Sequence, residues 1–412
     1  MAATKKKKDI TKTEAWDMAD WDYAGIIADD RMPLLSEPLR GQERIDTMKE
    51  ILGGCPEYYP AMFDIGQTHI ILGGDTEAKK WFDKCFKIIK EHFSKKDLID
   101  AYGKMCEFLK PVFRYELALE YYKILSELET KKNRKADAYD GMAYCYVMLD
   151  SIDKAIEVQQ KVLELDKSAR SYSITGWQLM IKGDIEKAED ALKKAVKLDK
   201  KDEYAKNNLD ICRLMKKQGI KTWNDYLLRK PDYDYLGELE DAEDEELLDK
   251  ADEYVRHHNV CKLEAFKSGL LKNPGYTLAE KHDIYITIKY ILKFIHDLNE
   301  DGWFLYDNAS TVNLFFKEIM HKFIFKTGDI DDKIFNDVYT ALLEFYKFLR
   351  KNGLVSGSEY KDLEKNMLGL KSELREKMLR YNEVRHNDDY SEEEKEEIRD
   401  ELFEGDHELL FL

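Results

Sequence analysis

Residues 136–202 decide the fold of this chain, because the same pattern is written there twice. The two copies read ADAYDGMAYCYVMLDSIDKAIEVQQKVLELDKS over 136–168 and ARSYSITGWQLMIKGDIEKAEDALKKAVKLDKKD over 169–202. Small residues stand at matching positions of the two copies: Ala143 with Gly176, and Ala155 with Ala188. A fixed period of this length predicts a stacked array of helix pairs, with the small residues where the two helices of a pair lie closest.

Looser copies of the pattern precede these two, and a single helix follows them. We expect a half unit from Gly41, full units at 59–93 and 99–128, and a closing helix over 203–218 with a polar outer face. The small residue of the second helix recurs in steps of 40, 37 and 33 residues, at Ala78, Ala118, Ala155 and Ala188. Repeat arrays place extra residues in loops, so the longer steps predict longer connections between helices.

Over about residues 41–218 the pattern resembles the tetratricopeptide repeat (TPR) family, whose unit is two antiparallel helices with small residues at these positions. The resemblance implies a solenoid in which the first helix of each unit lines a concave groove. The matching groove positions are Phe63, Gln67, Glu107, Asp140, Tyr144, Ser173 and Trp177. Because aromatic side chains dominate binding energy at interfaces, we expect Tyr144 and Trp177 to anchor a partner. The alternative is that both rings pack against a neighbouring unit.

The chemistry of these positions restricts the partner. Members of the family that bind chaperones clamp the C-terminal carboxylate of a peptide with lysine, arginine and asparagine side chains. Here the matching positions are mostly acidic, apolar or glycine, so we predict no such clamp. A basic or apolar peptide, bound as a strand or as a helix in a groove, fits better.

The rest of the chain is organised in blocks. We predict an N-terminal tail and first helix over 1–40, the solenoid over 41–218, an acidic linker over 219–250 and a separate helical domain over 251–412. From Asp232 to Asp252 there are eleven acidic residues and one lysine, which favours an extended, solvated segment, with an acidic helix as the alternative. Apolar stripes predict helices at 276–298, 311–325, 331–349, 358–385 (capped by Ser358) and from Ser391. The fold class is therefore all-α throughout, and residues 251–412 resemble no family.

Composition excludes several classes of function. The net charge of −17 disfavours nonspecific binding to nucleic acid or to anionic lipid. No apolar run approaches the roughly 18 residues of a membrane span, and no secretory signal follows the N-terminal lysines. Six cysteines without CxxC spacing suit a reducing cytoplasm and argue against disulfides and zinc. The near-heptad spacing at 358–385 leaves a homo-oligomer as an alternative to packing within the domain.

One loop resembles half of a calcium site. Asp297-Leu-Asn299-Glu-Asp301-Gly302 matches the opening of an EF-hand loop, where alternating oxygen ligands hold calcium. The last position needs a bidentate glutamate, but Asn308 stands there, and no second copy exists. An acidic turn between two helices is therefore favoured, and calcium binding is the alternative.

Two further groups of residues have the chemistry of candidate sites. Arg380 and His386 resemble the R-x(4–6)-H signature of the HEPN all-α ribonucleases, although Tyr381 departs from the family's small polar residue. His257, His258 and Cys261 lack further ligands at zinc-finger spacing, which predicts helix surface plus one buried thiol. We therefore predict a non-catalytic scaffold that binds a protein or peptide in the groove, without catalytic residues, metal or cofactor. The alternative is a HEPN-like ribonuclease domain regulated by the repeats.

Overall fold

The computed structural model describes residues 10–29, 38–240, 245–298, 304–327 and 330–405. Every regular element in these ranges is helical, which confirms the predicted all-α fold. The chain divides into two compact units, Met1–Trp223 with Pro274–His282, and Asn224–Asn273 with Asp283–Leu412. Each unit is built around its own core and is described separately.

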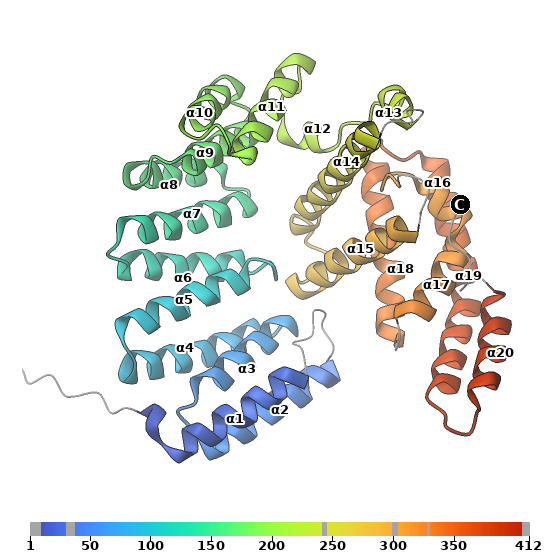
Figure 1. Ribbon diagram of the computed structural model, residues 1–412, viewed down its shortest axis with the longest axis horizontal. Coiled ribbons are helices and arrows are strands. Elements are labelled where there is room, and N and C mark those ends of the chain that lie inside the picture. The colour runs from blue at the N-terminus through green and yellow to red at the C-terminus, as the bar shows by residue number, and fades with distance from the viewer. Residues whose placement is uncertain (1–9, 30–37, 241–244, 299–303, 328–329, 406–412) are drawn as a thin grey trace, which may run out of the picture. The chain divides into compact units, whose positions relative to one another are not determined.

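The first unit is a stack of antiparallel helix pairs (Figure 1). Before the pairs come η1 (Ile10–Lys12), α1 (Glu14–Asp29) and α2 (Pro38–Gly54). Four pairs follow: α3 (Tyr59–Ile71) with α4 (Asp75–His92), α5 (Lys95–Leu109) with α6 (Tyr115–Leu128), α7 (Lys132–Met148) with α8 (Ile152–Leu165), and α9 (Ala169–Lys182) with α10 (Ile185–Leu198). The closing helix is α11 (Glu203–Gln218), which packs on α9 and α10. The predicted units and closing helix are thus confirmed as helices.

Small residues allow close packing within the pairs, as the repeat pattern predicts. A Cβ atom on Gly176 of α9 would lie 2.4 Å from Cγ of Leu192 in α10. The same holds for Gly66 of α3, where a Cβ would lie 2.2 Å from the ring of Phe82 in α4. The four alanines of the second helices, Ala78, Ala118, Ala155 and Ala188, are fully buried. Any larger side chain at these points would push the helices apart.

A left-handed residue turns the chain between the two helices of every pair. The backbone angle φ is positive at the same place in each repeat: Gly73 (80°), Phe113 (66°), Asp150 (57°) and Gly183 (86°). Each lies five residues before the alanine of its second helix. Because only glycine adopts this conformation without steric cost, Phe113 and Asp150 must be held in it by the packing of their pairs.

The extra residues of the first two repeats lie mainly in helices, so their predicted location in loops is wrong. Helix α4 has 18 residues, whereas α6, α8 and α10 have 14 each. Helix α7 has 17 residues and α9 has 14. A whole turn added to the end of a helix keeps its apolar face in register, so the stack tolerates the addition.

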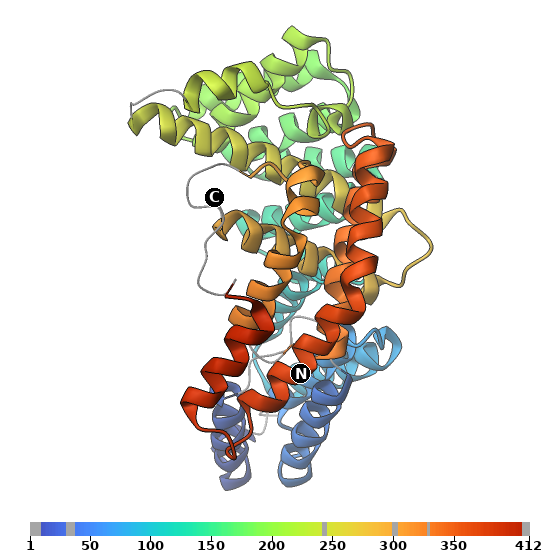
Figure 2. The same ribbon diagram turned by 90° about the vertical axis from the view of Figure 1, so that its right-hand side faces the viewer.

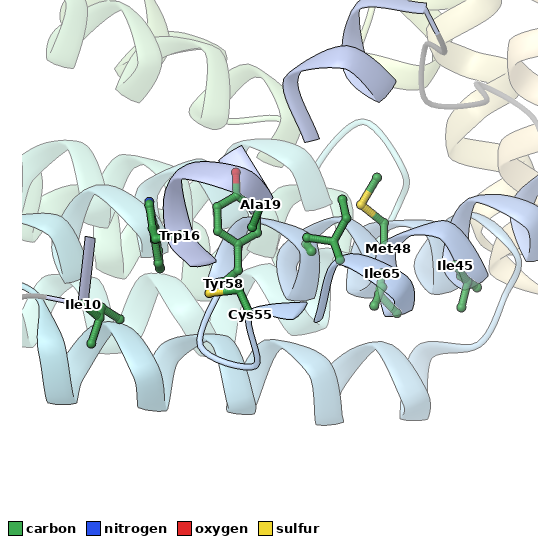
Figure 3. Packing of buried hydrophobic residues seen from close by; sticks show 10 residues of the cluster. Ile10, Trp16, Ala19, Ile45, Met48, Cys55, Tyr58 and Ile65 are labelled. Atoms are coloured by element: carbon green, nitrogen blue, oxygen red, sulfur yellow. The ribbon is translucent and has the colours of Figure 1, made fainter. Parts of the chain in front are cut away.

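The N-terminal end of the stack is closed by a core of aromatic and aliphatic side chains (Figure 3). Trp16 of α1 packs edge-on against Tyr58, with ring centroids 4.9 Å apart, and the Tyr58 hydroxyl donates to Asp20. In the same part of the unit, Arg44 of α2 binds Asp64 of α3 through two hydrogen bonds of 2.8 and 2.7 Å. Both side chains are buried, so removing one partner would leave an uncompensated charge inside the unit.

The second unit is a bundle of helices of unequal length, with 6 residues in Ala309–Leu314 and 29 residues in Gly357–Arg385. Its elements include α13 (Tyr233–Glu240), α14 (Glu245–Leu271), the part of α15 (Leu278–Leu298) from Asp283 onward, α16 (Ala309–Leu314), α17 (Phe316–Thr327), α18 (Asp332–Lys351), α19 (Gly357–Arg385) and α20 (Glu392–Phe403). Helix α18 supplies much of the core. Its Phe345 packs edge-on against Phe266 of α14 at 5.3 Å between centroids, and its Tyr339 packs against Phe316 of α17 at 5.5 Å. Figure 2 shows α20 running back beside the C-terminal part of α19.

Two local predictions for this unit are corrected. The single helix predicted at 311–325 is observed as two helices, because the helical conformation is interrupted at Phe315 between α16 and α17. The cap of α19 is Ser356 and not Ser358, since the Ser356 hydroxyl accepts from the amide of Glu359 at 3.1 Å. The capping box of Ser391 with Glu394 is confirmed.

The acidic stretch is helical where the structure describes it. Helices α12 (Trp223–Leu227), α13 and α14 lie within or enter residues 219–250, in agreement with the helical alternative. Leu236 and Leu239 of α13 are buried with Ala251 and Val255 of α14, which gives these acidic helices an apolar seam. The assignment of domains over the whole chain stays a prediction.

Each of the six cysteines lies within the described residues, where it is buried and forms no disulfide. Among the described residues, every helix is too short or too polar to cross a lipid bilayer.

The close packing of α9 on α10 generates a paired prediction. Gly176→Ala should lower the free energy of unfolding by about 1–3 kcal/mol, because the added methyl meets the fully buried Leu192. Gly103 in the middle of α5 has no atom within 4 Å of its virtual Cβ, so Gly103→Ala should raise that free energy by about 0.5–1 kcal/mol. Urea unfolding of the full chain, followed by circular dichroism, measures both. Equal stability of Gly176→Ala and the wild type would show that the pair does not need a glycine.

Candidate partner-binding site

A cavity of about 480 Å³ lies on the first helices of three consecutive pairs, α5, α7 and α9. Its lining contains four of the seven groove positions expected from the sequence, namely Glu107, Asp140, Tyr144 and Trp177. The other lining residues are Lys110, Tyr122, Asp137, Gly141, Arg170, Ile174 and Gln178.

Helical spacing explains why these residues share one surface. Asp137, Gly141 and Tyr144 are separated by four and then three positions, so they lie along one face of α7. Arg170, Ile174 and Trp177 repeat the same spacing on α9. The stack then brings the two faces side by side, with Glu107 of α5 at the edge.

Tyr122, on the second helix α6, also lines the cavity, because Gly141 of α7 has no side chain to occupy the space of the Tyr122 ring. A Cβ atom on Gly141 would lie 2.2 Å from Cζ of Tyr122 in α6. The Tyr122 hydroxyl donates to Oε1 of Glu107 at 2.8 Å. Gly141 therefore has a structural role between pairs that matches the role of Gly176 within a pair.

Each of the two basic side chains that line the cavity forms an ion pair with an acidic lining residue. Lys110 donates to Glu107 at 2.8 Å. Burial alone would raise the pKa of Glu107, but the hydrogen bonds from Lys110 and Tyr122 hold that pKa below its usual range. On the other side, Nη2 of Arg170 lies 3.1 Å from Oδ2 of Asp140, and burial raises the pKa of the Asp140 carboxyl. The cavity thus presents carboxylates that are partly neutralised by flexible cations.

The two expected anchors are both half-buried, so each has surface left for a partner. The centroid of the Tyr144 ring lies 6.2 Å from that of Tyr115 and 5.8 Å from Nζ of Lys110. Tyr144 therefore packs against the neighbouring pair and lines the cavity at the same time. Its role as an anchor stays a prediction, as does that of Trp177.

Three expected groove positions lie away from this cavity lining. The ring of Phe63 packs 6.0 Å from that of Phe82, and Gln67 is half-buried on α3. Ser173 is buried, and its hydroxyl accepts from Asn208 of α11 at 3.1 Å. Two basic cavity residues were not among the expected positions. Lys110 lies three positions after Glu107, and Arg170 lies three positions before Ser173. That helical spacing was the available signal.

The second unit contains a buried polar cluster around α14, so the expected surface position of its histidines is wrong for His258. His258 is buried, and His257 is half-buried with its Nε2 2.7 Å from the Tyr226 hydroxyl. Cys261 is the expected buried thiol, and Arg229 approaches it at 3.6 Å. Buried Lys262 donates to the carbonyl of Arg229 at 2.6 Å, which ties that loop to α14.

The remaining candidate groups have ordinary structural partners. Arg380 binds Glu383 at 2.9 Å and the Tyr390 hydroxyl at 3.2 Å, and His386 is the C-cap of α19. The nuclease role of this pair stays a prediction. In the calcium loop, residues 299–303 lie outside the described residues, and the Asn308 side chain caps α16 by accepting from Thr311. Within the described ranges, no three His, Cys, Asp or Glu side chains converge as metal ligands do.

Comparisons with known proteins identify the repeats. The tetratricopeptide repeat family model matches residues 59–92, 136–168 and 169–202, which carry the pairs α3–α4, α7–α8 and α9–α10. No curated protein matches the chain. A crystal structure of the TPR domain of P58(IPK) is similar at 13% identity, covering 87% of this chain and 94% of that one, with a TM-score of 0.25.

The buried histidines predict an acid-sensitive second unit. Burial lowers the pKa of His257 to about 4 and that of His258 to about 2, whereas an unfolded imidazole titrates near pH 6.5. Between about pH 6.5 and 4 the unfolded chain binds protons that the folded chain excludes, so stability falls as the pH falls. Each histidine should contribute up to about 1.4 kcal/mol per pH unit to this loss.

Urea unfolding of the full chain at pH 7.5 and pH 5 measures this loss. A double variant, His257→Gln with His258→Gln, should lose less stability on acidification than the wild type. Exposed His386→Gln is the control and should behave as the wild type does. An unchanged pH dependence in the double variant would contradict the assignment.

Proposed function

From the tetratricopeptide repeats that the family model matches at residues 59–92, 136–168 and 169–202, we propose that the chain is a non-catalytic scaffold that holds a peptide or partner protein on the first helices α5, α7 and α9. The observation that carries the proposal is the cavity in which Tyr144 and Trp177 meet Glu107 and Asp140. Tetratricopeptide repeats support protein–protein interaction in general. The location of the bound segment is the specific part of the proposal.

The physical basis is a preformed surface. Stacked repeats hold their first helices in fixed positions, so little conformational entropy is lost there when a partner binds. Two half-buried aromatic side chains then offer large contact area with few rotatable bonds. The partner needs no covalent chemistry from the protein, and the scaffold acts by complementarity of shape and charge.

The charge of the surface favours a basic or apolar partner over an acidic one. The chain carries a net charge of −17, and the cavity lining contains three carboxylates against two basic side chains. An acidic segment would meet repulsion both at long range and in the cavity. Six buried thiols suit a reducing compartment, so we place this function in the cytoplasm.

The alternative function is a ribonuclease in the second unit that uses Arg380 and His386. Incubating synthetic RNA with the full chain and with His386→Ala tests it. Cleavage by the wild type alone would support the nuclease, and intact RNA in both samples would remove it.

The groove proposal predicts a specific pattern of mutational effects. Peptides selected from a random displayed library on the immobilised full chain would be synthesised and titrated by calorimetry. Tyr144→Ala and Trp177→Ala should each weaken binding by about 1–3 kcal/mol, because truncating an aromatic anchor removes its buried contact area.

Matched controls lie elsewhere on the same unit. Tyr204 of α11 is 83% exposed and Trp21 of α1 is 82% exposed, both outside the cavity lining. Tyr204→Ala and Trp21→Ala should leave the affinity unchanged. The proposal fails if the cavity variants bind as the wild type does, or if the control variants lose binding equally.

A further inference from the structure

We propose that the cavity on α5, α7 and α9 receives one cationic side chain, an arginine or a lysine, of the bound segment. This inference rests on the proposed function and deepens it by naming the chemistry that the site recognises. Three features of the cavity carry it: an amide chain that ends in a buried oxygen, a carboxylate with one oxygen that accepts no hydrogen bond of ordinary length from a described residue, and aromatic walls that already lie near a cation.

The first feature is the amide chain behind the cavity. Nε2 of Gln159 donates to the carbonyl of Ser171 at 3.4 Å, and Nε2 of Gln178 donates to Oε1 of Gln159 at 3.4 Å. A backbone carbonyl can only accept, so this chain fixes the orientation of both amides. The last atom, Oε1 of Gln178, is therefore an oxygen.

That oxygen calls for a hydrogen-bond donor. Gln178 is 1% exposed and lines the cavity, and its Oε1 accepts no hydrogen bond from any described residue. A buried acceptor without a donor lowers the stability of a protein, so a donor that enters from a ligand recovers that loss. A lysine or arginine head group has only donors, which is the complement that this atom needs.

The second feature is the carboxylate of Asp140. Its Oδ2 accepts from Arg170, and the side-chain amide of Gln159 also interacts with the carboxyl. Its buried Oδ1 accepts no hydrogen bond of ordinary length from any described residue. The Arg170 side chain is 69% exposed, so this ion pair is formed in contact with water and is weak. A cation from a partner would bind Oδ1 directly and would compete with Arg170 for the carboxylate.

The third feature is the wall of the cavity. Nζ of Lys110 lies 5.9 Å from the ring centroid of Tyr122 and 5.8 Å from that of Tyr144, so these rings already attract a positive charge. Glu107, Asp137 and Asp140 outnumber Lys110 and Arg170 by one formal charge. One added cation neutralises the lining, whereas an added carboxylate would face the acceptor oxygens of Gln178 and Asp140.

The test uses pools of acetylated and amidated peptides with one fixed central residue and randomised flanks. The central residue is Arg, Lys, Gln, norleucine or Glu, and the binding of each pool to the full chain is measured by competition in fluorescence anisotropy. The Arg or Lys pool should bind at least about tenfold more tightly than the Gln and norleucine pools, and the Glu pool should bind most weakly. The order of the Arg and Lys pools identifies the head group.

Three variants assign this preference to the cavity. Asp140→Asn keeps the shape of the side chain and should abolish the preference for the cationic pools. Arg170→Ala removes the internal competitor and should strengthen their binding. Asp153→Asn on α8 removes the same charge from a side chain that is 80% exposed and should leave the preference intact.

The outcomes separate this inference from the proposed function. Equal binding of all pools overturns the inference, and so does a cationic preference that Asp140→Asn does not diminish. Groove binding still stands in either case if Tyr144→Ala weakens the binding of every pool. Binding that survives both Tyr144→Ala and Trp177→Ala overturns the proposed function as well, and so does the failure of the wild type to bind any pool. Thermal unfolding of each variant verifies that a loss of binding is not a loss of fold.

Discussion

The close approach of two helices at a small residue is the constraint on which the first unit depends. At Gly176 and Gly66 a single methyl group would collide with Leu192 and Phe82, so the helices of these pairs meet at points that only glycine permits. Protein interiors are too densely packed to absorb such a collision without a shift of backbone. The contact therefore fixes which face of α3 and of α9 is used for the core and which face remains for binding.

Close packing against a glycine also shapes the candidate site. Gly141 lets the Tyr122 ring pass between pairs, where its hydroxyl holds Glu107 in place. Because α5, α7 and α9 repeat one arrangement, side chains at helical spacing from each of them converge without any loop. A binding surface on rigid helices of this kind can select a partner by a few side chains, and this is how we interpret the pairing of carboxylates, cations and aromatic rings in the cavity.

The fold of the first unit could be predicted from the sequence because its signals are local and repeated, as at Ala155 and Ala188. Predictions of loop position and of side-chain exposure were wrong where they depend on packing that the repeat pattern does not encode. Whole turns added to α4 and α7 leave the apolar period unchanged, so they look like loop insertions. Four of seven expected site residues meet in one cavity, whereas Ser173 is buried by α11, a contact that repeat spacing does not encode. The positions that match the family do not include Lys110 and Arg170, which reach the cavity from one helical turn away.

Photo-crosslinking tests the central claim most directly, because it reports where a bound segment touches the protein. A selected peptide carrying a benzophenone side chain would be irradiated on the full chain, and the attachment sites would be identified by mass spectrometry. The account predicts crosslinks within residues 107–110, 137–144 and 170–178, on α5, α7 and α9 and the turn that follows α5. Crosslinks confined to the second helices α4, α8 and α10, or to the second unit, would contradict it.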